Sequence, residues 1–445
     1  MTRQYFQTDG IRGEVGKQPM TVDFSLRLAS AASKVLVPNG GTVIIGKDTR
    51  VSGYMFEAAL EAGFVASGVD VLLTGPLPTP AVAFLTRKLN ADFGVVISAS
   101  HNPYYDNGIK LFDREGKKFS DEIESSIELH LDDDVITSSS KSLGQAKHIS
   151  SARIDYQRFC KSTVPDKTNF DKLKIVIDAA NGAGYKVAPH VLNDFGAEVI
   201  PVGCSPNGRN INQGCGSTHP DLLKLTVPGV RADVGIALDG DADRVLMVDH
   251  DGCLINGDQL LYVLALDQLN QGTLKGPVVG TVMSNLGLEL VLKNLGIDFL
   301  RAKVGDRYVL EMLKLNGGTL GGETSGHLIC LDKATTGDGM ISALQVLEVM
   351  VRTGKSLKEL VSGLQLYPQT VINVKVPNSF EPLKNISLNK ALDDAENKLA
   401  GKGRVILRSS GTEPVIRVMV EGDDKEIVNS IAHNLANSVQ AAVSS

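Results

Sequence analysis

Three groups of residues in this chain have the types and the spacing that phosphoryl transfer needs. An apolar run ends at Ser98-Ala99-Ser100-His101-Asn102-Pro103, where a turn-forming Asn-Pro would present the Ser100 hydroxyl at a strand end. Asp239, Asp241 and Asp243 stand at alternate positions, and residues 408–412 gather anion-binding groups. A nucleophile, a group of metal-binding carboxylates and a phosphate-binding turn together predict phosphoryl transfer.

The three aspartates predict a divalent cation site. In an extended stretch, alternate residues point to the same side, so the three carboxylates would repel one another without a cation. Mg²⁺ commonly binds a few carboxylates and keeps positions for phosphate oxygens or water. An acidic turn is the alternative reading. An EF-hand is excluded, because its loop requires Gly and Glu where this chain has Arg244 and His250. Arg244 could neutralise charge on the transferred group, or simply pair with a carboxylate.

The Ser100 hydroxyl needs activation, because an ordinary serine is a weak nucleophile. It requires a neighbouring base, or it already carries the phosphoryl group that it donates, in which case the phosphoserine also supplies a metal ligand. Lys110 lies on the next apolar segment and could return beside Ser100 to exchange a proton. His101 is the other candidate catalytic group here. Taken alone, this segment could be only a turn.

Two further turns are predicted to bind a sugar phosphate. Residues 321–327 offer a carboxylate, two hydroxyls and an imidazole, groups that suit sugar hydroxyls or an amine; the candidates are Glu323, Ser325 and His327. Residues 408–414, with a second arginine nearby, combine guanidinium groups, hydroxyls and a glycine that lets backbone N–H groups approach an anion. The phosphate-binding candidates are Arg408, Ser409, Ser410, Gly411, Thr412 and Arg417. Either turn could instead be a solvated surface turn.

Length and composition bound the class of protein. At 445 residues the chain is long enough for about three domains. The net charge of −6, without a long Lys/Arg block, argues against a nucleic-acid partner. The five cysteines show no C-x-x-C spacing and are expected to be reduced thiols. No signal sequence or membrane-spanning apolar stretch is found, so we expect a cytoplasmic protein without a membrane partner.

Hydrophobic patterns predict repeated α/β units followed by an α+β tail. β-branched runs at 42–45, 173–177 and 277–282 each precede turn residues and a helical period, which favours parallel strands with crossover helices. A polar connection at 137–144 and turns after the strand at 245–248 suggest boundaries near residues 150 and 255. In the tail we expect strands at 371–376, 404–407 and 415–420, and helices at 388–399 and 424–443.

The last helix has a clear start signal. Asp423 is the expected cap and Glu426 completes a capping box. Its apolar stripe, expected to pack on the small sheet, consists of Ile427, Ile431, Leu435 and Val439.

Five segments, in this order, resemble the motifs of the α-D-phosphohexomutase superfamily. They are T-D-G-I-R-G at 8–13, S-A-S-H-N-P at 98–103, D-G-D-A-D-R at 239–244, G-E-T-S-G-H at 322–327 and R-S-S-G-T-E-P at 408–414. The first contains Arg12, an additional candidate catalytic residue facing the cleft. Longer segments at 105–110, 304–309, 331–339 and 415–422 resemble the branch of the superfamily that acts on amino-sugar phosphates.

The resemblance implies an α/β fold of three successive units with mixed sheets plus a smaller C-terminal α+β domain around a central cleft. The four expected domains are 1–150, 151–255, 256–368 and 369–445. It also implies that phosphorylated Ser100 converts glucosamine 6-phosphate through a 1,6-bisphosphate into glucosamine 1-phosphate, a precursor of UDP-N-acetylglucosamine. Mg²⁺ would be bound by Ser100, Asp239, Asp241 and Asp243, and a homodimer is possible. We further expect the C-terminal domain to close over the sugar, with a hinge near 366–370.

The chain departs from the family pattern at one position, and three alternative functions stay open. Gln7 stands where the family usually has glycine, and it would be strained if that position required a positive φ. The same machinery could act on a neutral hexose phosphate. An aspartyl phosphatase could use Asp239 or Asp241 as its nucleophile, and a non-catalytic phosphosugar sensor could keep the phosphate-binding turn alone.

Overall fold

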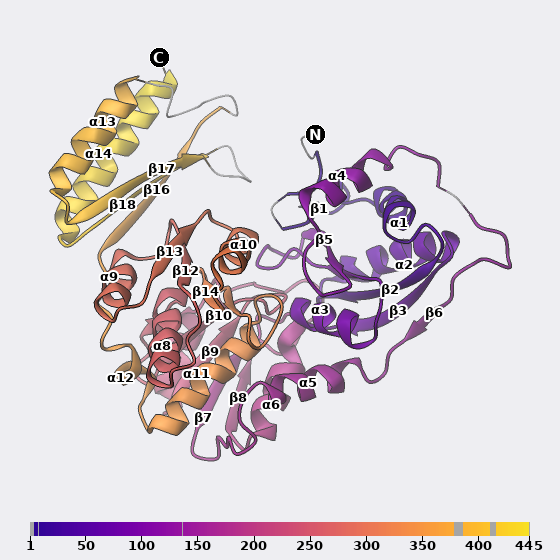
Figure 1. The fold of residues 1–445 in the computed structure, drawn as a ribbon, viewed down its shortest axis with the longest axis horizontal. Helices are drawn as coiled ribbons and strands as arrows, with labels where there is room; N and C mark the ends of the chain where they lie inside the picture. The colour runs from indigo at the N-terminus through magenta and orange to yellow at the C-terminus, as the bar shows by residue number, and fades with distance from the viewer. Residues whose placement is uncertain (1–3, 8, 136, 378–385, 410–414, 445) are drawn as a thin grey trace. The chain divides into compact units, whose positions relative to one another are not determined.

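The computed structural model describes residues 4–7, 9–135, 137–377, 386–409 and 415–444 (Figure 1). Its contacts divide the chain into a larger unit, Met1–Val282 with Leu300–Ser362, and a smaller unit, Met283–Phe299 with Gly363–Ser445. Over the described ranges the chain forms four β-sheets in succession, of which the last is wholly antiparallel. The predicted α/β class with mixed sheets and a smaller α+β tail is confirmed.

The first sheet has the strand order β1-β5-β4-β2-β3-β6, with β2 parallel to β3 and β4 and with β5 antiparallel to β4 and β1. Its elements are β1 (Ile11–Glu14), α1 (Val22–Leu36), β2 (Gly41–Lys47), α2 (Val51–Ala66), β3 (Val69–Pro76), α3 (Thr79–Lys88), β4 (Phe93–Ile97), β5 (Asp106–Asp113), α4 (Asp121–Leu129) and β6 (Ala146–His148).

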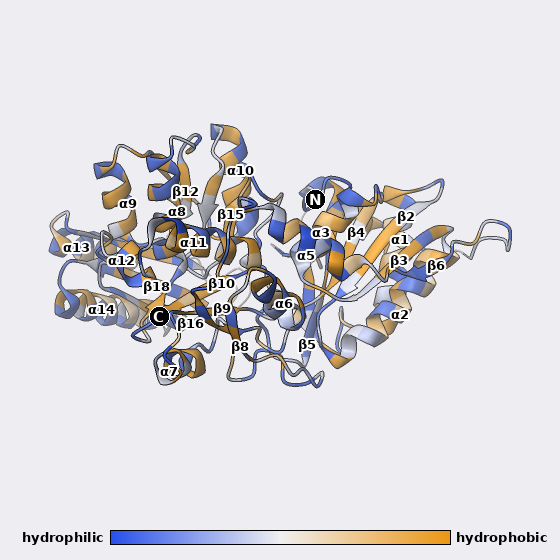
Figure 2. Cartoon of the chain, turned by 90° about the horizontal axis from the view of Figure 1, so that it is seen from below, coloured by the Kyte–Doolittle hydropathy of each residue, from blue (hydrophilic) through white to orange (hydrophobic). Residues whose placement is uncertain are grey.

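Helices bury this first sheet on both faces. Apolar side chains of α1, α2 and α4 form one core with inward residues of the strands. On the other face, α3 lies so close that a β-carbon at Gly46 would come within 2.4 Å of Val82 Cγ2. A strand buried on both faces is hydrophobic throughout rather than alternating, and Figure 2 shows β4 mostly in the hydrophobic colour.

Two smaller sheets complete the larger unit. The second sheet, in the order β11-β10-β9-β7-β8, uses α5 (Ala152–Ser162), β7 (Lys174–Asp178), the 3-10 helix η1 (Ala183–Tyr185), α6 (Val187–Asp194), β8 (Glu198–Val202), α7 (Asp221–Gly229), β9 (Val234–Leu238), β10 (Val245–Asp249) and β11 (Leu254–Ile255). The third, in the order β13-β12-β14-β15, uses α8 (Gly257–Asn270), β12 (Val278–Thr281), β13 (Phe299–Ala302), α10 (Asp306–Asn316), β14 (Leu320–Gly322), β15 (Leu328–Cys330), α11 (Gly339–Thr353) and α12 (Leu357–Val361). The predicted strands at 42–45, 173–177, 245–248 and 277–282 are therefore confirmed as β2, β7, β10 and β12.

The smaller unit contains an antiparallel sheet in the order β16-β18-β17. Its elements are α9 (Leu286–Asn294), β16 (Gln369–Lys375), α13 (Ile386–Leu399), β17 (Gly403–Ser409), β18 (Val415–Gly422) and α14 (Lys425–Ser444). Residues of α13 and α14 pack with the strands in two neighbouring apolar clusters. The strands and helices predicted for the tail are confirmed, and the domain boundaries near 150, 255 and 368 stay predictions.

Two details of the last helix were predicted wrongly. The capping carboxylate is that of Asp424, not Asp423, because α14 begins at Lys425 and Asp424 Oδ1 accepts hydrogen bonds from the N–H groups of Glu426 and Ile427 at 2.8 and 3.0 Å. Ile427 is 47% exposed, whereas its neighbour Val428 is fully buried. The apolar face of the helix therefore begins one residue later than the stripe suggested, although Ile431, Leu435 and Val439 are buried as expected.

Within the described residues, no helix combines the length and the apolar character that crossing a bilayer requires.

The corrected cap gives a test of the C-terminal unit. Replacing Asp424 by Ala removes two hydrogen bonds from the first turn of α14 and should lower the stability of this helix by about 1 kcal/mol, the usual cost of losing an N-cap. The matched change Asp423→Ala should cost less than about 0.5 kcal/mol, as for an ordinary surface position. Amide hydrogen exchange across α14 measures both, and equal effects of the two changes would contradict the assignment.

Candidate active site

The loop after β4 places Ser100 at the centre of a buried polar cluster. Ser100 has a φ of +50° and a side chain that is almost completely buried. Its Oγ donates a hydrogen bond to Asp239 Oδ2 at 2.6 Å and lies 3.3 Å from His101 Nδ1. The Ser100 N–H donates to Ser98 Oγ at 2.9 Å. Burial, followed by the charges of Arg244 and Arg12, lowers the pKa of His101 to about 4.

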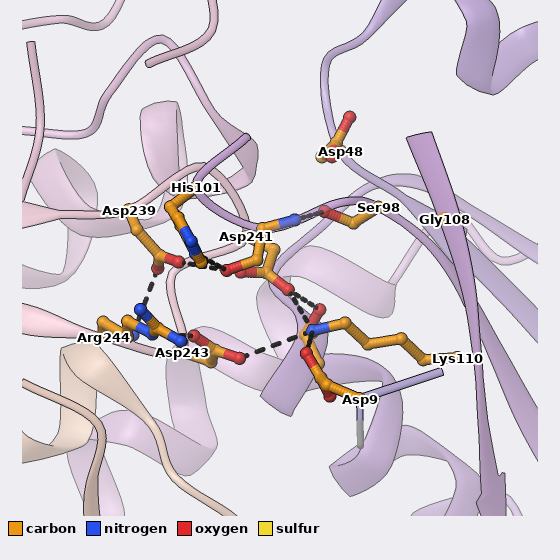
Figure 3. A network of polar contacts seen from close by, with 12 residues as sticks. Asp9, Asp48, Ser98, His101, Gly108, Lys110, Asp239, Asp241, Asp243 and Arg244 are labelled. Carbon is orange, nitrogen blue, oxygen red and sulfur yellow. Dashed lines mark hydrogen bonds and ion pairs between the residues drawn. The ribbon is translucent and has the colours of Figure 1, made fainter. Parts of the chain in front are cut away.

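The three aspartates converge in the loop between β9 and β10 (Figure 3). One carboxylate oxygen from each of Asp239, Asp241 and Asp243 lies within 4.8 Å of the others, and all three residues are buried. The reason given from the sequence was wrong, since the stretch is not extended. It turns sharply, with Ala242 in the left-handed region at a φ of +59°, and the turn brings the carboxylates together.

These aspartates fit a divalent cation. Within the described chain, Asp241 Oδ1 and Asp243 Oδ1 are buried and accept no hydrogen bond, which is costly for a carboxylate oxygen without a ligand. Burial, together with the charges of Asp243 and Asp241, raises the pKa of Asp239 well above its usual value. A hard cation would favour the ionised form of all three and would give both oxygens a ligand.

The Lys110 side chain extends from β5 and contacts two of the same carboxylates, as well as that of Asp9. Its Nζ lies 2.9 Å from Asp241 Oδ2, 2.9 Å from Asp9 Oδ2 and 3.5 Å from Asp243 Oδ2. Burial alone would lower the pKa of Lys110, but these carboxylates outweigh it and raise the pKa above its usual value. Lys110 therefore contacts the aspartates that surround Ser100, and its proton exchange with the serine stays a prediction.

The two candidate arginines of the larger unit also face this cluster. Arg12, on β1, forms an ion pair with Asp9. The Arg244 N–H donates to Asp239 Oδ1 at 3.1 Å, and Arg244 Nε lies 3.9 Å from Asp243 Oδ1. Burial alone would lower the pKa of Arg244, but Asp243 and Asp239 raise it.

Gln7 does not strain the turn that leads to Arg12. Its side chain is exposed and its φ is not positive. The Gln7 N–H donates to Gly10 O at 2.9 Å. The positive φ, +79°, falls on Gly10, where a β-carbon would approach Ile109 O to 2.5 Å. The position that needs glycine is therefore residue 10, and the departure at residue 7 carries no penalty.

The predicted sugar-binding loop joins β14 to β15. Two of its candidate residues are buried and one is exposed. Glu323 is largely buried and its Oε1 accepts a hydrogen bond from the Gly305 N–H at 2.9 Å, whereas Ser325 is exposed. His327 is buried, with Nδ1 3.6 Å from Asp243 Oδ1 and Nε2 3.6 Å from Asp306 Oδ2. Burial opposes protonation, but the two aspartates outweigh it and raise the pKa of His327 to about 9.

Lys118, Asp306 and Thr79 are further polar residues of the site that were not predicted from the sequence. Lys118 Nζ lies 2.5 Å from Asp9 Oδ1 and 2.6 Å from Asp306 Oδ2. Thr79 Oγ1 donates to Asp241 Oδ2 at 2.7 Å. Acidic and basic side chains alternate around a closed chain of contacts, the charge ring: Lys110, Asp9, Lys118, Asp306, His327 and Asp243, which returns to Lys110. Asp241 contacts Lys110 from outside this ring. Asp306 lies within the segment 304–309 that resembled the superfamily, but no local signal indicated Lys118 or Thr79.

In the smaller unit, the strands place two predicted phosphate ligands together. Arg408 on β17 lies directly opposite Arg417 on β18. Like charges at opposed positions destabilise a sheet unless an anion or acidic group compensates them, and paired guanidinium groups are well suited to phosphate. Ser409 ends β17, whereas the predicted ligands Ser410, Gly411 and Thr412 lie outside the described residues.

Family profiles match along nearly the whole chain. They describe phosphoglucomutase/phosphomannomutase α/β/α domain I at 3–135, domain II at 155–252, domain III at 256–367 and the C-terminal domain at 371–438. The phosphoglucosamine mutases of Photorhabdus laumondii and Alcanivorax borkumensis are each 54% identical to this chain, over 441 residues (99% of both chains) and 444 residues (100% of both). The chain belongs to the phosphoglucosamine mutase family. It is accordingly a phosphohexomutase, an isomerase.

Solved structures share this family fold at lower identity. A phosphoglucomutase/phosphomannomutase family protein from Burkholderia thailandensis has a TM-score of 0.81 at 24% identity, with 98% of this chain and 97% of that chain covered. The N-acetylphosphoglucosamine mutase of Aspergillus fumigatus, in complex with GlcNAc-6P and magnesium, has a TM-score of 0.69 at 18% identity, with 99% and 96% covered.

The aspartate loop of this phosphoglucosamine mutase homologue predicts stabilisation by Mg²⁺. At about 100 times its dissociation constant, the cation should raise the free energy of unfolding by about 2.7 kcal/mol. Asp239→Asn should abolish most of this gain without destabilising the metal-free protein, because the raised pKa of Asp239 means that its charge is already disfavoured. Thermal unfolding with and without Mg²⁺ measures the effect. The control Asp251→Asn changes an exposed acid outside the loop and should keep the full gain, and a gain that survives in the Asp239 variant would contradict the site.

Proposed function

We propose that this protein interconverts glucosamine 6-phosphate and glucosamine 1-phosphate, with Ser100 carrying the phosphoryl group between turnovers. The observation that carries the proposal is the 2.6 Å contact of Ser100 Oγ with Asp239 Oδ2, which puts a buried hydroxyl against three carboxylates that could hold a cation. The relatives at 54% identity carry the name phosphoglucosamine mutase, which favours an amino-sugar phosphate over a neutral hexose phosphate.

The proposed cycle has two phosphoryl transfers. In the first, the bond between Ser100 Oγ and phosphorus breaks while the free sugar hydroxyl bonds to the same phosphorus and loses its proton, which gives the 1,6-bisphosphate. In the second, Ser100 Oγ takes the other phosphoryl group and the sugar oxygen that is released gains a proton. His101 and Lys110 are the predicted proton carriers, and Arg12 and Arg244 hold positive charge towards the transferred group.

Asp239, Asp241, Asp243 and an oxygen of Ser100 are the proposed ligands of Mg²⁺. When bound, Mg²⁺ supplies positive charge against the phosphoryl oxygens, as in other phosphoryl-transfer enzymes. The Asp239 carboxylate also orients the Ser100 hydroxyl when the serine is unmodified. The aspartates therefore have a function in both states of the serine.

The remaining candidates are proposed to bind the sugar and the distal phosphate. Glu323, Ser325 and His327 would contact the ring substituents. The phosphate that is not being transferred would be bound by Arg408, Ser409, Ser410, Gly411, Thr412 and Arg417. An anchor of this kind suits a bisphosphate that must be bound in two opposite orientations. A structure of the Aspergillus fumigatus enzyme with glucose 1,6-bisphosphate supports such a ligand. Closure about a hinge near 366–370, a homodimer and a cytoplasmic location stay predictions.

Ser100→Ala tests the covalent cycle. Loss of the acceptor oxygen should lower kcat/KM for glucosamine 6-phosphate by about a thousandfold or more, because the proposed cycle passes each phosphoryl group through this oxygen. Intact mass should show one phosphoryl group on the active wild-type protein and none on this variant. The exposed Ser139→Ala is the control and should retain both activity and the modification. Turnover that survives in Ser100→Ala would favour an aspartate nucleophile, and a wild-type protein without modification or turnover would favour a sensor.

Arg417→Ala tests the distal phosphate site. Charge-assisted hydrogen bonds contribute about 1.5–3 kcal/mol, so kcat/KM should fall about 10- to 100-fold. Steady-state kinetics with glucosamine 6-phosphate measures the change. The control Lys402→Ala removes an exposed cation of the same unit and should leave the kinetics unchanged within about twofold. A fall in kcat/KM only in the Arg417 variant would therefore report loss of the phosphate site rather than loss of one positive charge.

A further inference from the structure

The backbone of the Ser100 loop is bound by two side-chain donors from different sheets of the larger unit. Arg50 lies between β2 and α2, and Asn212 lies between β8 and α7. Arg50 Nη2 donates to Ser100 O at 3.3 Å and to Asn102 O at 2.6 Å. Asn212 Nδ2 donates to the same two carbonyl oxygens, at 2.9 Å each. We call these four contacts the carbonyl clamp.

Both donors of the carbonyl clamp are buried and fixed in place. Arg50 is completely buried, its guanidinium forms an ion pair with Asp48, and its N–H donates to Asp48 Oδ1 at 2.8 Å. Asn212 is 6% exposed, and its N–H donates to Ala180 O at 2.9 Å. Its φ is +58°, a conformation that asparagine tolerates better than most residues. Contacts with residues outside the Ser100 loop therefore hold both donors in place.

The clamp holds a conformation that the loop would not favour by itself. Ser100 has a φ of +50°, and a non-glycine residue in this region costs of order 1–3 kcal/mol unless its surroundings fix it. If the loop relaxed, Ser100 Oγ would leave its position beside Asp239. The clamp also abuts the aspartate loop, because a β-carbon at Gly240 would come within 2.5 Å of Ser100 O and 2.8 Å of Asn212 Nδ2.

We infer that Arg50 and Asn212 are positioning residues for phosphoryl transfer. They act through the carbonyl groups of residues 100 and 102 and fix the Ser100 oxygen relative to the aspartates, without touching the reacting atoms. This inference rests on the proposed function for its kinetic consequence, but the clamp itself is a property of the loop.

Asn212→Gly tests the inference with little backbone strain, because glycine accepts the positive φ while the amide donor is lost. Misplacing a reacting group by about 1 Å can cost about 100-fold in rate, so kcat should fall about 10- to 100-fold. KM and the stabilisation by Mg²⁺ should change less than about twofold, since the substrate and metal ligands are untouched. Asn90→Gly is the matched control: Asn90 is exposed, has a φ of +53°, and should keep wild-type kinetics.

Arg50→Lys is the second variant, because it keeps the positive charge but loses the planar guanidinium, in which Nη1 contacts Asp48 while Nη2 donates to both carbonyls. It should also lower kcat, and amide hydrogen exchange across residues 98–102 should be faster in both clamp variants than in Asn90→Gly. If Asn212→Gly kept the kcat of its control, or lost its kcat together with the Mg²⁺ stabilisation, the positioning role would be overturned. If the wild-type protein lacked mutase activity, the proposed function would fail, and the exchange rates alone would decide whether the clamp holds the loop.

Discussion

Repulsion among buried carboxylates is the constraint on which the arrangement of the larger unit depends. Asp239, Asp241 and Asp243 are held close together away from water, and removing charges from water is expensive unless they are paired. The charge ring places cations between acids at every other position. A phosphoserine would add about two negative charges and a divalent cation two positive ones, so the two additions leave the balance unchanged. Modification of the serine, as proposed, would therefore be electrostatically linked to occupation of the site by a metal.

Loops at the carboxyl ends of strands supply the reactive groups, and several of these loops contain unusual backbone. Ser100 follows β4, the aspartates follow β9, Arg50 follows β2 and the turn at 179–182 follows β7. Ligands of α/β sheets commonly bind at these ends. Positive φ values occur at Ser100, Ala180, Asn181, Asn212 and Ala242, all non-glycine residues of these loops or of the loop before α7. The rigid strands and the hydrogen bonds described above stabilise conformations that isolated turns would avoid.

The sequence could predict features that are encoded locally. Ser100, the aspartates and Arg244 lie in short segments whose chemistry is legible without a fold, and β2, β7 and β12 carry β-branched runs. Lys118 and Asp306 could not be selected, because their importance comes from contacts between residues far apart along the chain. Arg50 and Asn212 could not be selected either, because they bind backbone carbonyls. Every residue has a carbonyl, so the residue types in the Ser100 loop do not indicate these contacts. The errors at Asp423 and Ile427 were shifts of one residue, since a cap depends on where the first hydrogen-bonded turn begins.

The charge ring also joins the elements of the first three sheets to one another. Asp9, Lys110 and Lys118 come from the first, Asp243 from the second, and Asp306 and His327 from the third. If one of these sheets opened locally, buried charged side chains of the other two sheets would lose their oppositely charged partners. We therefore expect the larger unit to melt as a single cooperative foldon, so that a ligand bound at its centre protects distant amides in all three layers alike.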